Sequence, residues 1–122
     1  MTLATRYAAL GTGALVVLQF LWHAWLAPPA RGPGWVVAGI FALPLLAVAV
    51  LFVARKPGAA VSAGMIALLY FCHGIMEAWA EPAVWPLGLA EAGLAAWVVF
   101  AAGWDGLRAR IAARRARATP PV

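Results

Sequence analysis

The chain has 122 residues, of which 66% are hydrophobic and 11% are charged, and its mean hydropathy is +0.90. A soluble domain of this length needs polar groups over most of its surface, and nine basic and four acidic side chains cannot cover that surface. This composition excludes a soluble protein, and the expected partner is the lipid bilayer. The net charge of +5 does not predict a nucleic-acid partner, because the Lys and Arg residues lie between apolar stretches.

Four apolar segments are each long enough to cross a hydrocarbon core of about 30 Å, which takes about 20 helical residues. They cover residues 7–27, 35–54, 59–80 and 84–107, and each break between them contains proline. The segments lack the two-residue alternation of barrel strands, and an open sheet edge has no hydrogen-bonding partner in lipid. We therefore predict an all-α integral membrane protein: a four-transmembrane-helix bundle over residues 1–107, followed by a basic tail over 108–122.

The first segment has a competing interpretation, because Ala24-Trp25-Leu26-Ala27 loosely resembles the cleavage site of a signal peptide. Gln19, Trp22 and His23 stand where such a site needs small residues, which favours an uncleaved span. Five tryptophans fall near the same ends of the segments, where indole rings prefer the headgroup region. They are Trp22, Trp25, Trp35, Trp79 and Trp85.

In the second segment, Pro44 predicts a kink and a freed backbone carbonyl. The positive charges then set the orientation, because cytoplasmic loops carry an excess of Lys and Arg. Arg6, Arg55, Lys56 and the five arginines of residues 108–117 lie in the three regions that share one side, while the first connection holds only Arg31. We therefore expect both termini in the cytoplasm.

Polar side chains inside the spans are the informative residues, because an ionisable group near the bilayer centre costs about 2.5–3.5 kcal/mol and needs a partner. The third segment carries four of them on one helical face, at spacings of three, four and four, and Gly74 beside them permits close approach of another helix. The first and fourth segments add polar groups at similar depth in the outer half of the bilayer. We predict a polar cluster that opens toward the periplasm and consists of His23, Tyr70, His73, Glu77 and Glu91.

Four interpretations of this cluster stay open. The His–Glu contacts hold the helices together and bind nothing; the groups relay protons or bind a small ligand; His73 and Glu77, four residues apart, share a metal ion; or His23 and His73 ligate a haem. The structural interpretation comes first, because carboxylates near the membrane edge reach water and a two-ligand spacing is a weak motif. We assign no metal ligand and no cofactor from the sequence.

Two stretches resemble a known family. Leu21-Trp22-His23-Ala24-Trp25-Leu26-Ala27-Pro28-Pro29, and the motif Tyr-Phe-x-His-Gly-x-x-Glu-Ala that begins at Tyr70, are similar to bacterial membrane proteins of the domain-of-unknown-function family 2069. The similarity extends over nearly the whole chain. The resemblance implies a multi-pass protein of the inner membrane of a Gram-negative bacterium, and it implies no activity.

The sequence carries no Walker loop, no Gly-x-Ser-x-Gly elbow and no HExxH motif, so nothing indicates an enzyme. The small size and short connections favour a non-enzymatic accessory or assembly subunit of an inner-membrane complex, with a membrane-protein partner or a second copy of the chain. The alternatives are a small proton-coupled carrier, or a metal- or haem-binding membrane protein, that uses the polar cluster.

Overall fold

The computed structural model describes residues 1–121, and over that range it contains helices and no strand. The elements are α1 (Leu3–Phe20), the π-helix η1 (Leu21–Leu26), α2 (Gly34–Val53), α3 (Ala59–Ala80), the 3-10 helix η2 (Pro82–Val84) and α4 (Trp85–Ala118). Four helical segments are long and apolar enough to cross a membrane: Leu3–Leu26, Gly34–Val53, Ala59–Ala80 and Pro82–Ala118. The predicted all-helical class with four spans is confirmed. Val122, the last residue of the predicted tail, lies outside the described residues.

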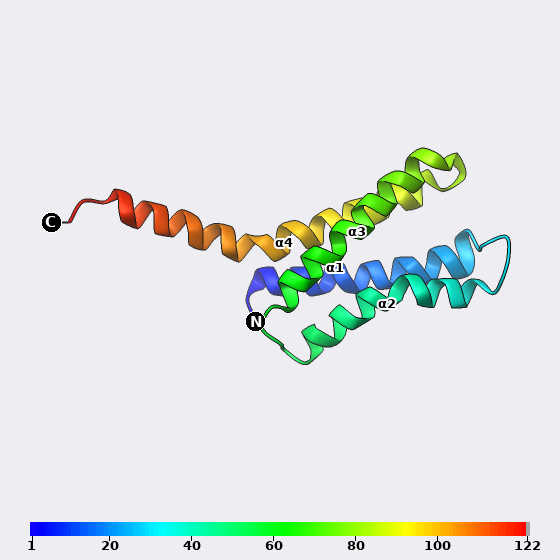
Figure 1. The fold of residues 1–122 in the computed structure, drawn as a ribbon, viewed down its shortest axis with the longest axis horizontal. Coiled ribbons are helices and arrows are strands. Elements are labelled where there is room, and N and C mark those ends of the chain that lie inside the picture. Colours follow the sequence, from blue (N-terminus) through cyan, green and yellow to red (C-terminus); the bar gives the residue numbers. More distant parts are fainter. Residues whose placement is uncertain (122) are drawn as a thin grey trace.

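The helices form two hairpins that pack together (Figure 1). The connections over residues 27–33 and 81–84 lie at one end of the molecule, whereas the N-terminus and the α2–α3 turn lie near each other toward the opposite end. Helix α3 packs most extensively against α4, α4 also packs against α1, and α1 packs against α2. Helix α4 then continues past the bundle (orange to red in Figure 1).

Small residues form the contact faces, as is usual in membranes, where apolar side chains gain little by leaving lipid for protein. On α3 the buried residues are Ala59, Ala63, Ala67, Tyr70 and Gly74, a stripe at spacings of three and four. Large apolar side chains such as Leu69, which is 65% exposed, lie on the outer surface. The buried stripe therefore leads from small apolar residues directly to the polar part of α3.

Helices α3 and α4 approach each other very closely at Gly74 of α3 and Gly88 of α4. A Cβ added at Gly74 would lie 2.5 Å from the Gly88 carbonyl oxygen, and one added at Gly88 would lie 2.5 Å from the Gly74 carbonyl oxygen. Both distances are far shorter than any real contact of a Cβ atom. The predicted role of Gly74 is confirmed, and this contact brings the polar face of α3 against Glu91 of α4.

Candidate polar site within the helix bundle

Glu91 is the centre of the polar cluster. Its side chain is fully buried, and both carboxyl oxygens have partners on other helices. The Gln19 side-chain amide on α1 donates to Oε1 at 2.7 Å, and Nδ1 of His73 on α3 lies 2.7 Å from Oε2. The second distance fits an imidazole N–H that donates to a carboxylate, which is a strong type of hydrogen bond. One acid on α4 therefore joins three helices.

His73 links this buried acid to the more exposed part of the cluster. Its Nε2 lies 3.9 Å from Oε1 of Glu77, one turn further along α3. The side chain of His73 is 20% exposed and that of Glu77 is 32% exposed, whereas Glu91 is 0% exposed. The groups thus form a short series of contacts, Glu91–His73–Glu77, that passes from the interior toward the surface.

His23 lies on the short π-helix η1 at the end of the first span. The π-helix is marked by the bond from the Ala27 N–H to the Trp22 carbonyl, 2.8 Å long and five residues apart. Such π-helical turns are rare in proteins, and many of those that occur lie at functional sites. The π-turn follows the α-helical stripe that ends in Gln19, and both Gln19 and His23 are buried. The sequence predicted a helix here but did not predict this change of helix type.

Aromatic rings enclose the imidazoles. The Trp22 ring stacks on His23 with centroids 5.1 Å apart. The Phe41 ring of α2 stacks on His23 with centroids 4.4 Å apart, and it also contacts His73 in a tilted arrangement with centroids 5.1 Å apart. Trp22 differs from the other tryptophans near these helix ends, because its side chain is only 3% exposed and packs against protein instead of facing lipid. The other four tryptophans of that group, which are exposed, are Trp25, Trp35, Trp79 and Trp85.

Tyr70 makes a hydrogen bond to a backbone carbonyl of α2 and not to an acidic side chain of the cluster. Its hydroxyl donates to the carbonyl of Phe41, three residues before Pro44. A proline inside a helix disturbs the hydrogen bonds of the preceding turn, and a polar side chain from a neighbouring helix can satisfy the carbonyls there. Figure 1 shows α2 changing direction along its length, as the proline predicts. Tyr70 therefore connects the bent helix α2 to the polar face of α3.

The structure thus brings His23, His73, Glu77 and Glu91 into one cluster, with Tyr70 at its α2 side. Two participants were not among the predicted site residues. Gln19 was visible as a polar residue four positions before His23, so its spacing was a usable signal. Phe41 had no such signal, because nothing in an apolar run distinguishes the phenylalanine that will contact two imidazoles.

Two buried polar atoms of the cluster have no hydrogen-bond partner in the described part of the chain: Oε1 of Gln19 and Nε2 of His23. Buried polar atoms are almost always paired with protein or with an ordered water. These two atoms are therefore the positions in the cluster that can form a further hydrogen bond to water or to a small polar ligand.

The geometry is less suited to the metal and haem interpretations. Among residues 1–121, no group of three or more His, Cys, Asp or Glu side chains is placed to hold a metal ion. The Phe41 ring contacts both His23 and His73, so it takes up space that a haem between these two imidazoles needs. In the arrangement described, the residues do not fit a bis-histidine haem.

Comparison with known proteins agrees with the motifs that begin at Leu21 and Tyr70. A family model described as "Predicted membrane protein (DUF2069)" matches residues 7–108. The chain belongs to this family. No match was found among curated proteins or among solved structures. The matched range contains every residue of the polar cluster and ends at Arg108, so DUF2069 comprises the four spans without most of the basic extension of α4.

Proposed function

We propose that this DUF2069 protein is a non-enzymatic accessory or assembly subunit of a complex in the bacterial inner membrane. The observation that supports this proposal best is the part of α4 beyond the bundle. Every residue from Gly103 to Ala118 is exposed, although the segment is a continuous helix. At about 1.5 Å per residue the 34-residue helix is about 51 Å long, against a hydrocarbon core of about 30 Å. A projecting helix whose side chains are exposed suits attachment to another subunit.

The polar cluster supports the same proposal. Its one fully buried acid, Glu91, has both oxygens occupied by Gln19 and His73. A buried network of this kind fixes which helices pack together and in what register, which is a structural use of polar groups. A subunit that stabilises a partner needs such a fixed bundle and needs no reacting group.

Co-purification from membranes tests the accessory role. A photo-crosslinking residue at Ala113, which is exposed on the projecting helix, should yield one discrete protein adduct. The matched control is the same residue at Val50, which is 64% exposed on the surface of α2 and should yield none. Native mass spectrometry in a mild detergent should give the same partner in fixed stoichiometry. A lone monomer without any adduct at Ala113 would contradict the proposal.

We further propose that both termini are cytoplasmic. Eight of the nine Lys and Arg residues lie in regions at the end of the bundle that includes the N-terminus, and only Arg31 lies in a connection at the opposite end. A fluorescent protein fused after residue 121 should fold and fluoresce in intact cells, while alkaline phosphatase inserted between residues 30 and 31 should be active. The reverse pattern would exclude this orientation.

A second candidate function, a small proton-coupled carrier, is favoured by the two unpaired atoms, Oε1 of Gln19 and Nε2 of His23. Nε2 of His23 can take up a proton and Oε1 of Gln19 can accept a hydrogen bond from water. Together with Glu91–His73–Glu77, they place buried groups of a proposed proton path next to partly exposed ones. Vesicles with an entrapped pH dye and an imposed pH gradient test it. Wild-type vesicles should lose the gradient faster than protein-free vesicles, and Glu91→Gln should abolish the difference. Equal rates in wild-type and protein-free vesicles would eliminate the carrier.

Elemental analysis and an absorption spectrum of the purified protein test the metal and haem alternatives. A colourless, metal-free sample is expected from the geometry of the cluster.

A further inference from the structure

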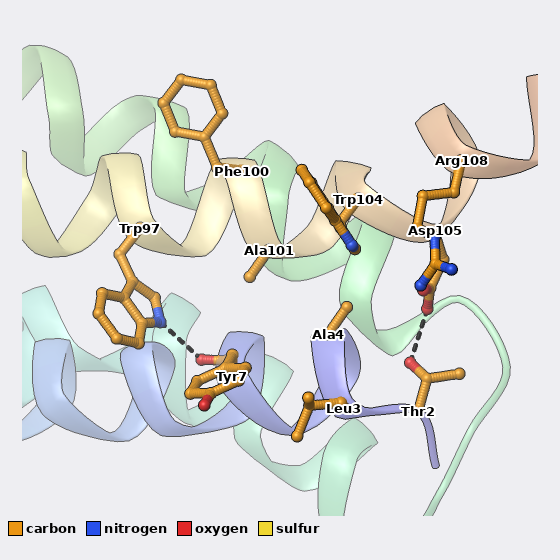
Figure 2. A pocket seen from close by; sticks show the side chains of 10 residues that line it. All are labelled: Thr2, Leu3, Ala4, Tyr7, Trp97, Phe100, Ala101, Trp104, Asp105 and Arg108. Atoms are coloured by element: carbon orange, nitrogen blue, oxygen red, sulfur yellow. Dashed lines mark hydrogen bonds between the residues drawn. The ribbon is translucent and has the colours of Figure 1, made fainter. Parts of the chain in front are cut away.

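A cavity of about 610 Å³ lies between α1 and α4, at the end of the bundle that holds the N-terminus. Its volume is in the range of ordinary ligand sites. Four aromatic side chains line it, as Figure 2 shows: Tyr7, Trp97, Phe100 and Trp104. The indole N–H of Trp97 donates to the Tyr7 carbonyl at 2.9 Å, and the two rings meet edge to face with centroids 5.7 Å apart. Tyr7 and Trp97 are therefore held in place by contacts between the two helices.

The cavity extends from acyl-chain depth to headgroup depth. Helix α4 begins at Trp85, and about 20 helical residues cross the hydrocarbon core, so the core ends close to Asp105. Trp97 and Phe100 then lie at the level of lipid tails. Asp105 and Arg108, which line the other end of the cavity, lie at the level of lipid headgroups. This depth holds for either orientation of the chain in the membrane.

The headgroup end of the cavity carries an available positive charge. Asp105 accepts a hydrogen bond from the Thr2 hydroxyl at 2.6 Å. The side chain of Arg108 makes no hydrogen bond or ion pair with any of residues 1–121, although it overlaps that of Asp105 in the view of Figure 2. Asp105 is the one acid near this end, against eight basic residues. An anion at Arg108 therefore meets a strongly positive surface.

The helix beyond the cavity also combines apolar and basic side chains. Trp104, Leu107 and Ile111, at spacings of three and four, form an apolar stripe whose side chains are 52%, 51% and 42% exposed. Arginines flank this stripe on both sides at positions 108, 110, 114 and 115. An apolar stripe bordered by arginines is the pattern of helices that contact anionic lipid. An acidic protein surface would match the charges but not the aromatic cavity at acyl depth.

We propose that this cavity binds an anionic phospholipid. One acyl chain lies against Tyr7, Trp97 and Phe100, and the headgroup phosphate is bound by the guanidinium of Arg108. A guanidinium can bind a phosphate through two hydrogen bonds, which distinguishes a seated lipid from diffuse attraction to the basic helix. The site is independent of the accessory and carrier roles proposed above.

Lipid binding to the full-length, delipidated protein in detergent tests the site, with native mass spectrometry as the readout. Phosphatidylglycerol should bind as one tight equivalent, with an affinity about tenfold or more above that of zwitterionic phosphatidylcholine, because only the former has a net negative charge. Arg108→Gln should remove about tenfold of this preference. Phe100→Ala should weaken both lipids equally, since it alters only the acyl-chain contact.

The matched control is Arg117→Gln, which removes the same charge from the same helix away from the cavity and should change the affinity less than about twofold. Equal losses in Arg108→Gln and Arg117→Gln would mean diffuse attraction and would overturn the proposal. Equal affinity of the wild type for the two lipids would overturn it without the use of any variant. Circular dichroism of each variant verifies that the helices are intact.

Discussion

Polar side chains are buried and paired at one end of the bundle, whereas they are exposed at the other end. At the end with Glu91, an acid, an amide and an imidazole from three helices are buried and bind one another. At the end with Arg108, the charged side chains are exposed and mostly without protein partners. The first arrangement fixes how the helices pack, and the second leaves charge available to the surroundings. In this protein, burial therefore distinguishes the polar groups that stabilise helix packing from those that can bind lipid or a partner.

The largest effect should come from the close helix contact beneath the buried cluster. Gly74→Leu places a side chain where even a Cβ lies 2.5 Å from the Gly88 carbonyl, so it should cost more than about 3 kcal/mol and prevent packing of α3 on α4. The matched control is Gly93→Leu, because a Cβ there has nothing within 4 Å. Unfolding by SDS titration in mixed micelles measures both. Similar stability of the two variants would mean that α3 and α4 do not approach closely.

The next effect concerns the buried acid itself. Glu91→Leu leaves the Gln19 amide and the His73 imidazole without their partner. At about 1–2 kcal/mol for each of these two groups, the substitution should cost roughly 2 to 4 kcal/mol. Glu91→Gln should cost less, because an amide can still bond to both neighbours. Glu81→Leu is the control, since Glu81 is exposed. A stable Glu91→Leu protein would show that this end is not held by its polar network.

A smaller effect is expected where α3 meets the bent helix α2. Tyr70→Phe removes the hydroxyl that donates to the Phe41 carbonyl, and hydrogen bonds between membrane helices average about 0.6 kcal/mol. Tyr7→Phe serves as the control, because the part of Tyr7 that bonds to Trp97 is its backbone carbonyl. The same SDS titration measures the difference. A loss of several kcal/mol in Tyr70→Phe would mean that this hydroxyl contributes as much to stability as the contacts of Glu91.

The smallest effect should lie at the exposed end. Thr2→Ala removes the cap of α1, where the side chain accepts from the Thr5 N–H, and the bond to Asp105 on α4. Loss of an exposed cap should cost about 0.5 kcal/mol. Thr119→Ala, at the far end of α4, should have no measurable effect. If Thr2→Ala destabilised the protein as much as Glu91→Leu, the contrast between the two ends would be lost.

Composition and local pattern were sufficient for much of the fold. A chain with so few charges has to lie in lipid, and backbone groups in lipid need partners within the same helix. The four apolar runs and the proline-containing breaks between them therefore predicted four helical spans without tertiary information. The spacing of Tyr70, His73 and Glu77 likewise predicted a shared face, because helical geometry fixes which side chains lie together.

Which groups on different helices meet was decided only by the tertiary structure. The sequence placed His23, His73 and Glu91 at a similar depth, but it did not indicate that Glu91 bonds to Gln19 and His73 while His23 stacks between Trp22 and Phe41. Those contacts depend on the rotation of each helix, on the π-turn at His23 and on the contact of Gly74 with Gly88. Helix rotation is set by packing, and the many apolar residues of this chain are compatible with several rotations, so periodicity alone cannot select one.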